Sequence, residues 1–181
     1  AVLQATTGKP REVAKEAQDH IEALRRLFFS IIEHLKDLHH QQTGTHDDTS
    51  TAQAQKDDNE RRRRMGPLAD AQGRHAALAK ALGEALAAQA DQAASAPAGG
   101  PSQPGQPGQP SQPDAAQAAK TLAQAAEEVR KAHGTMATAQ GHLSDDLKAP
   151  VTPDLEPVLG QQKLALQHLE QAIALLEPPQ Q

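Results

Sequence analysis

Three of the nine histidines of this chain lie in one short stretch, LHHQQTGTHDDTST, which runs from Leu38 to Thr51. Histidine and aspartate side chains are frequent metal ligands and frequent general acids and bases. The same stretch contains Gly44 followed by Thr45, residue types that can end one helix and begin the next. Two interpretations are therefore open: a metal or catalytic site, or the place where a helix turns polar or breaks.

The spacing of carboxylates and histidines gives only weak metal candidates. A di-iron carboxylate bundle uses Glu-x-x-His motifs, and the sequence contains none. The nearest substitutes are Asp37 with His40, three residues apart, and His142 with Asp146, four residues apart. In a heptad register with Ile21 at position a, His40 falls at f on the outer face of its helix. We therefore predict neither a metal nor another cofactor.

Other chemistries have little support in the sequence. The chain has no cysteine, which excludes disulfides, thiolate ligands and cysteine nucleophiles. It has no G-x-S-x-G motif, and Ser30, the one serine amid the apolar part of the first helix, has no predicted base beside it. With Phe28 and Phe29 as the whole aromatic content and a net charge of -5, a nucleic-acid surface is not expected. We predict a protein that is not an enzyme.

An apolar stripe with alternating steps of three and four residues predicts a long first helix. It includes Ile21, Leu24, Phe28, Ile31, Leu35 and Leu38, and its register continues through Gln42, Thr45, Thr49 and Ala52. We expect the helix to stop near Thr43 and a new one to begin at His46. The alternative is a helix that runs on to the arginines.

The run DDNERRRRMGP contains the most basic part of the chain. Because its arginines stand just before Gly66-Pro67, it predicts the C-terminal end of a helix, with a new helix after the proline. A phosphate or partner site is the alternative. Each of three acids lies four residues before an arginine, in the order that favours i,i+4 ion pairs: Asp57 with Arg61, Asp58 with Arg62, and Glu60 with Arg64.

Three more amphipathic stretches follow, and strand signals are absent from the sequence. The second stretch includes Leu68, Gln72, His75, Ala79, Leu82 and Leu86; the third, behind Asp114 as N-cap, runs from Ala118 to Leu143; the fourth includes Leu155, Gln162, Leu169 and Leu176. We predict an all-α protein, a four-helix bundle of long amphipathic helices with a proline- and glutamine-rich linker between the second and third.

This pattern predicts the following organisation: a flexible N-terminus at 1–9, a helical hairpin at 10–93 with breaks at 44 and 66, a linker at 94–114, a second hairpin at 115–177 and a tail at 178–181. Prolines recur every third residue from Pro101 to Pro113, which is typical of polyproline II. At ~3.1 Å per residue the linker reaches about 50 Å. It could cross the whole bundle, so parallel and antiparallel orders of the second and third helices both remain open.

Several predicted stripe positions are polar, and these are the candidate site residues. They are Gln42, Thr45, Gln72, His75 and Gln162. Polar residues in such a stripe commonly specify register and partner, and a small-molecule cavity lined by Gln, Thr and His is the alternative. We expect His75 and His133 to be hydrogen-bonded interior histidines rather than ligands or proton switches.

The stretches LRRLFFSIIEHLKDL and GQQKLALQHLEQAIALLEPPQQ resemble helical envelope proteins that are encoded beside MoxR-type ATPases and von Willebrand factor A proteins in bacterial aerotolerance-type operons. The resemblance rests on composition and transfers no functional residue. It implies a non-enzymatic, membrane-associated scaffold or adaptor on the periplasmic side.

The first functional hypothesis is therefore a helical scaffold or adaptor that binds a protein partner through its helices, with a homo-oligomer also allowed. Because the sequence begins at Ala1 without Met, we expect an exported protein from which a leader or membrane anchor has been removed; a cytoplasmic chain trimmed for expression is the alternative. The second hypothesis is a ligand-sensing ectodomain of a membrane receptor. A metal-binding bundle is the third and least favoured.

Overall fold

A computed structural model describes residues 9–95 and 112–177, with side chains for 29–95 and 116–177. It contains four helices: α1 (Lys9–Gln53), α2 (Asp58–Ser95), α3 (Gln112–Lys148) and α4 (Glu156–Leu176). No strand is present in these described ranges. The prediction of an all-α four-helix bundle is confirmed.

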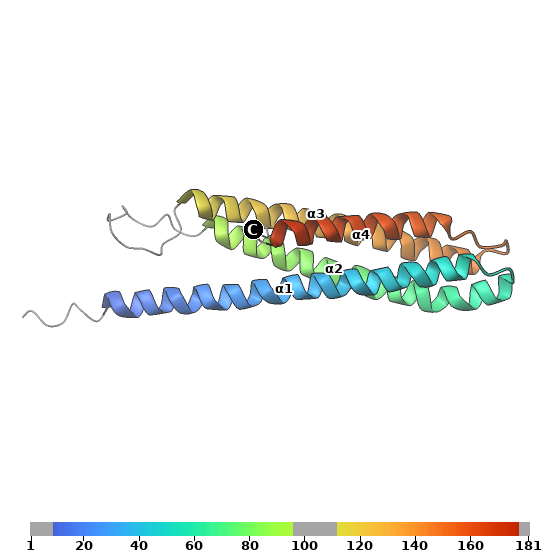
Figure 1. The fold of residues 1–181 in the computed structure, drawn as a ribbon, viewed down its shortest axis with the longest axis horizontal. Helices are drawn as coiled ribbons and strands as arrows, with labels where there is room; N and C mark the ends of the chain where they lie inside the picture. The colour runs from blue at the N-terminus through green and yellow to red at the C-terminus, as the bar shows by residue number, and fades with distance from the viewer. Residues whose placement is uncertain (1–8, 96–111, 178–181) are drawn as a thin grey trace, which may run out of the picture.

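The helices alternate in direction and form a closed ring of neighbours, in which α1 contacts α2, α2 contacts α3, α3 contacts α4, and α4 contacts α1 (Figure 1). The two short loops lie at one end of the bundle (Figure 1). The helices α2 and α3, on either side of the linker, are antiparallel. The ring of His133 lies against the carbonyl of Ala76, and Gly73 lies beside Gln140. The relative direction of the second and third helices, which the length of the linker left open, is thus antiparallel.

The predicted stripes form the core. On α1 all the predicted positions from Ile31 to Ala52 are buried, and on α2 the six positions from Leu68 to Leu86 are buried. On α3 the stripe is buried from Ala125 to Leu143, whereas Ala118 is exposed and the next residue, Ala119, is buried in its place. Burial of these stripes against one another is the main source of stability in such a bundle.

The predicted break at Gly44 is wrong, because α1 continues without interruption through it to Gln53. A continuous helix keeps Gln42, Thr45 and Thr49 on the buried face. The threonine hydroxyls of this stretch donate hydrogen bonds to backbone carbonyls four residues earlier in the same helix, as Thr49 does to Thr45 at 2.7 Å. The helix α1 therefore needs no new N-terminus here.

The expectation that Asp114 is an N-cap is also wrong. The helix α3 begins at Gln112, so Asp114 lies inside it.

The second predicted break, at 66, is also wrong, because α2 begins at Asp58 and runs through Gly66 and Pro67. The turn between α1 and α2 lies earlier, at residues 54–57. The arginines thus occupy the first turns of a helix instead of the last. Of the three expected ion pairs, Glu60 with Arg64 forms at 3.3 Å.

Arg61 and Arg62 instead join the two loops. The Arg61 guanidinium donates to the carbonyl of Pro153 at 2.9 Å and to that of Gln55 at 2.6 Å. Arg62 donates to the carbonyl of Asp146 at 3.1 Å and also to that of Val151. Carbonyls at helix ends and in loops lack intrahelical partners. The two arginines supply those partners and hold the α1–α2 turn against the α3–α4 loop.

In the parts of the chain that the structure describes, no helix has the length and hydropathy to cross a bilayer.

We predict that Gly44→Ala stabilises the protein. A Cβ at this position meets nothing within 4 Å, and alanine is favoured over glycine inside a helix by about 0.5–1 kcal/mol. Urea unfolding followed by far-UV circular dichroism measures the change. Gly44→Pro serves as the opposite control and should destabilise by about 3 kcal/mol or more. A loss of stability in the alanine variant would show that the helix does break at this glycine.

Candidate functional site

Three buried glutamines meet inside the bundle at one level. Gln42 on α1, Gln72 on α2 and Gln162 on α4 each have a relative exposure of 0%. The amides of Gln42 and Gln72 are paired in both directions, at 3.2 and 3.0 Å. The Gln162 amide nitrogen donates to the Gln72 oxygen at 3.1 Å and to the Thr49 hydroxyl at 3.0 Å. The residues Gln42, Gln72, Gln162, Thr49 and His75 are together called the polar layer below.

His75 is attached to the polar layer through Gln42. Its Nδ1 lies 3.1 Å from the Gln42 side-chain oxygen, and the residue is buried. Burial lowers the pKa of the His75 imidazole below its ordinary value, and the positive charge of Arg74 lowers it further. The expectation of a hydrogen-bonded interior histidine is confirmed for His75, whereas His133 is hydrogen-bonded but only half-buried, with its Nδ1 3.0 Å from the Ala76 carbonyl.

Four of the five predicted polar stripe residues are thus brought together. The fifth, Thr45, is buried too, but its hydroxyl donates to its own helix, at the Gln41 carbonyl. Thr49 connects the layer to this helix, because its hydroxyl donates to the Thr45 carbonyl while its oxygen accepts from Gln162. No sequence rule identifies which stripe residues share one level, since that depends on how far the helices are shifted along one another.

The polar layer separates two apolar clusters. The larger includes Leu35, Leu38, Leu86, Val129 and Leu169, and the smaller includes Met65, Leu68, Leu143, Leu155 and Val158. A shift of one helix along another would move an amide into an apolar cluster and leave it unpaired. Each unpaired buried group lowers the stability by about 1–3 kcal/mol. The layer therefore fixes the relative positions of α1, α2 and α4.

The chemistry available in the polar layer is hydrogen bonding by amides, a hydroxyl and one imidazole. Most polar side-chain atoms of the layer pair with one another, and the Gln162 side-chain oxygen is buried without a partner. A binding site for a small molecule would offer several such free groups. The arrangement is therefore better suited to holding register than to holding a ligand.

The weak metal candidates are not brought together. Asp37 and His40 lie on α1, and His142 and Asp146 lie on α3, across the bundle from it and without contact between the two helices. Asp37 accepts a hydrogen bond from Gln41 at 2.7 Å instead. Within the described ranges no cluster of three or more His, Asp or Glu side chains is arranged to hold a metal ion.

Ser30 does have a histidine beside it, contrary to the prediction. The Nδ1 atom of His34 lies 3.3 Å from the Ser30 hydroxyl and 2.5 Å from the Ser30 carbonyl oxygen. Because a carbonyl only accepts, this nitrogen must carry the hydrogen. It is then not available to take a proton from the hydroxyl, and the pair does not activate Ser30 as a nucleophile.

A hydrogen bond between α3 and α4 was missed from the sequence. Glu128 lies 2.7 Å from both the Lys131 ammonium and the His168 ring. The hydrogen bond from Lys131 and that from His168 hold the pKa of the Glu128 carboxyl below its usual range. The i,i+3 spacing of Glu128 and Lys131 could have indicated their pairing, whereas the partnership with His168 depends on the alignment of the two helices.

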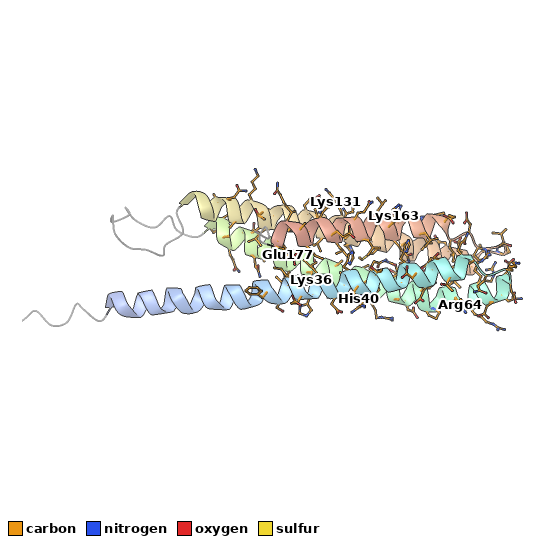
Figure 2. All side chains as sticks on the ribbon, viewed as in Figure 1. Lys36, His40, Arg64, Lys131, Lys163 and Glu177 are labelled. Atoms are coloured by element: carbon orange, nitrogen blue, oxygen red, sulfur yellow. The ribbon has the colours of Figure 1, made fainter. Side chains whose placement is uncertain are left out.

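The helix α4 is much shorter than α1, with 21 residues against 45. It ends where Glu177 meets Lys36, at 2.8 Å (Figure 2). One turn further along α1, His39 contacts Glu170 of α4 at 3.2 Å, so this face of α1 lies toward α4. Phe29 is one heptad before Lys36 on the same face, and it is 67% exposed. The region past the last turn of α4, where α1, α2 and α3 continue, is called the short-helix end.

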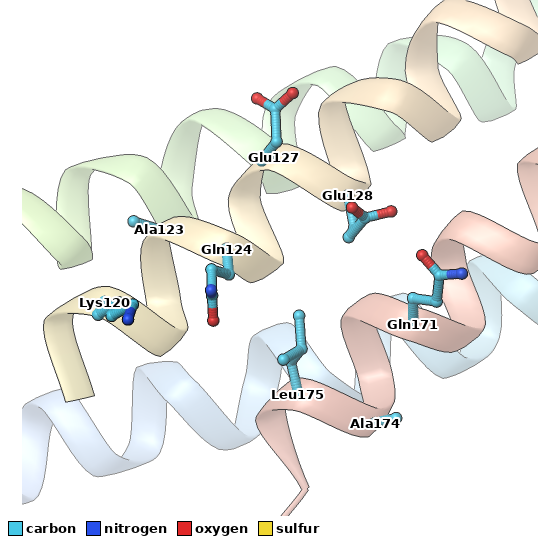
Figure 3. Close-up of a pocket in the computed structure, with 8 residues that line it drawn as sticks. All are labelled: Lys120, Ala123, Gln124, Glu127, Glu128, Gln171, Ala174 and Leu175. Carbon is cyan, nitrogen blue, oxygen red and sulfur yellow. The ribbon is translucent and has the colours of Figure 1, made fainter. Parts of the chain in front are cut away.

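A groove lies between α3 and the last turns of α4, next to the short-helix end (Figure 3). Its volume is about 710 Å³, and it is lined by Lys120, Ala123, Gln124, Glu127, Glu128, Gln171, Ala174 and Leu175. Figure 3 shows Leu175 of α4 reaching toward α3 beside Gln124. The groove and Phe29 together make this end of the molecule the best candidate for a helix-binding surface.

We predict that Gln72→Met destabilises the protein by about 1–3 kcal/mol, because the Gln42 and Gln162 amide nitrogens lose their shared acceptor inside the bundle. Gln171→Met, on the exposed face of α4, is the matched control and should change the stability by less than about 0.5 kcal/mol. Urea unfolding measures both. Equal effects of the two variants would mean that the polar layer has no special role.

We predict that stability falls as the pH drops below about 6.5, the ordinary pKa of histidine. Burial lowers the pKa of His75 in the folded protein, so just below that pH the unfolded chain binds more protons, and stability decreases until the folded ring also becomes protonated. His75→Gln should remove this part of the pH dependence, whereas His142→Gln, at an exposed histidine, should retain it. Urea unfolding midpoints measured between pH ~5 and ~8 test the sign of this pH dependence. A stability that rises on acidification would contradict the prediction.

The chain matches no family model, no curated protein and no solved structure. The resemblance to envelope proteins, drawn from two helical stretches, therefore stays a prediction.

Proposed function

We propose that this chain is a non-enzymatic helical scaffold or adaptor that binds a protein partner by helix–helix contact, in the bacterial cell envelope. The observation that carries the proposal is the exposure of Phe29 on the α4-facing side of α1, past the point where α4 ends. Large aromatic side chains are the usual anchors of protein interfaces. Covering an exposed phenylalanine is worth about 1–2 kcal/mol.

The short-helix end has the shape that suits a helical partner. The helices α1, α2 and α3 continue there without α4 (Figure 1), and the groove lined by Leu175 lies just before that point, between α3 and the last turns of α4. An amphipathic helix laid into such a groove is a common mode of protein recognition. The partner would contribute the apolar face that the short α4 does not supply.

The polar layer supports a scaffold over the alternative of a ligand sensor. A scaffold must hold its helices in a fixed alignment, and the paired amides of Gln42, Gln72 and Gln162 do this. A sensor needs free polar groups for its ligand, whereas the amides of this layer are mostly paired with one another. Placement in the envelope rests on the resemblance of the first and last helical stretches.

Site-specific photocrosslinking tests the proposal. A photoreactive amino acid at position 29 should form adducts with a partner in cells, because this position lies at the short-helix end. The same residue at position 151 is the matched control, since Val151 is 65% exposed but lies at the opposite end, in the α3–α4 loop. Adducts at 29 and not at 151, enriched in the envelope fraction, are expected. Equal labelling at both positions would contradict a specific surface.

A further inference from the structure

We propose that the tail, residues 178–181, packs over the exposed Phe29 ring of its own chain when no partner is bound. The tail lies outside the residues that the structure describes. The inference rests on the proposed function, because it adds an intramolecular competitor at the surface proposed for the partner. It depends on where the tail starts, which way it leaves α4 and how far it reaches.

The tail starts on the Phe29 side of α1. Its attachment point is Glu177, whose carboxylate lies 2.8 Å from the Lys36 ammonium. Phe29 is one heptad before Lys36, so both residues lie on the face of α1 that is turned toward α4. The contact with Lys36 therefore holds the start of the tail beside the face that carries the exposed ring.

The tail leaves α4 in the direction of Phe29. The helix α4 runs antiparallel to α1, and its successive contacts approach the N-terminal half of α1. The backbone of Glu177 has φ −77° and ψ 133°, which is polyproline II geometry. Pro178 follows, and the residue before a proline favours this geometry. A tail that continues along the line of α4 therefore passes toward lower residue numbers of α1, where Phe29 lies.

The tail is long enough to pass Phe29. The one-heptad step along α1 from Lys36 to Phe29 is about 10 Å, at about 1.5 Å per residue. Four residues in polyproline II geometry span about 12 Å, at about 3.1 Å per residue. The tail therefore reaches the Phe29 ring with the helices in their present positions.

The composition of the tail suits this contact. Its first two residues are Pro178 and Pro179, and docking of proline-rich segments on aromatic side chains is the basis of polyproline II recognition. Proline is also restricted in conformation before it binds, so less chain entropy is lost when it becomes ordered than for other residues. The exposed Phe29 ring and the attached pair of prolines therefore match in chemistry as well as in position.

The contact between the tail and Phe29 is autoinhibitory. The tail and a partner helix use the same aromatic ring, so the two contacts exclude each other. A partner must displace the tail before it covers Phe29, and its apparent affinity is lowered in proportion to the fraction of molecules in which the ring is free. Removal of the proline contact should therefore strengthen partner binding.

Nuclear magnetic resonance of the full chain tests the contact directly. The chain has two phenylalanines, Phe28 and Phe29, and neither Tyr nor Trp, so the ring signals are few and Phe29→Leu assigns them. Nuclear Overhauser effects should connect the Phe29 ring with proline protons, and they should disappear in the variant Pro178→Ser with Pro179→Ser. Pro150→Ser, in the α3–α4 loop at the opposite end, is the matched control and should retain them. Their absence from wild-type spectra overturns the proposal.

Disulfide trapping gives a second readout, because the chain has no cysteine of its own. The variant Glu33→Cys with Gln180→Cys keeps both prolines and Phe29, and it should form a disulfide within one chain on oxidation in dilute solution. His34→Cys with Gln180→Cys is the matched control, since His34 is also exposed but lies five residues after Phe29 and thus on another face of α1. Equal trapping at both positions overturns the proposal, as does a disulfide between two chains in place of one within a chain.

Photocrosslinking from position 29 separates this proposal from the proposed function. Replacement of Pro178 and Pro179 by serine should raise the yield of adducts with the partner, because the competing contact is lost. If the yield stays the same or falls, the autoinhibitory contact is overturned while the proposed function stands. If the nuclear Overhauser effects are present but no adducts form from position 29, the contact with the tail stands and the proposed function fails.

Discussion

The paired amides of Gln42, Gln72 and Gln162 are the interaction on which the rest of the structure depends. Apolar stripes rich in alanine and leucine attract one another at many relative shifts, because the hydrophobic effect has no direction. Hydrogen bonds between buried amides are directional and costly to leave unmade. They select one shift, and from that shift follow the two apolar clusters on either side and the alignment of both helix ends.

The two ends of the bundle differ as a result. At the loop end Arg61 and Arg62 supply donors to carbonyls at the ends of α1 and α3 and in the loops, so this end is closed by the chain itself. At the other end α4 stops beside Lys36 while its neighbours continue, and Phe29 is left exposed. The loop end is thus held by hydrogen bonds within the chain, whereas the other end leaves an aromatic side chain uncovered.

The proposed function follows from that difference. Most polar atoms of the polar layer are paired with one another, whereas Phe29 on α1 is exposed beyond the last turn of α4. This exposed aromatic side chain, together with the groove between α3 and the last turns of α4, supports the proposal that a helical partner binds at this end.

The sequence by itself determined the helical class and the buried face of each helix, because the spacing of residues such as Leu35, Gln42 and Gln72 follows the period of an α-helix. It misplaced the breaks at Gly44 and Gly66, since local glycine signals were weaker than the packing that keeps α1 and α2 continuous. Only the tertiary structure decided which stripe residues meet, where the arginines donate and where α4 leaves Phe29 uncovered. Those features depend on the shift between helices, and that shift is set by hydrogen bonds between residues 30 to 113 positions apart.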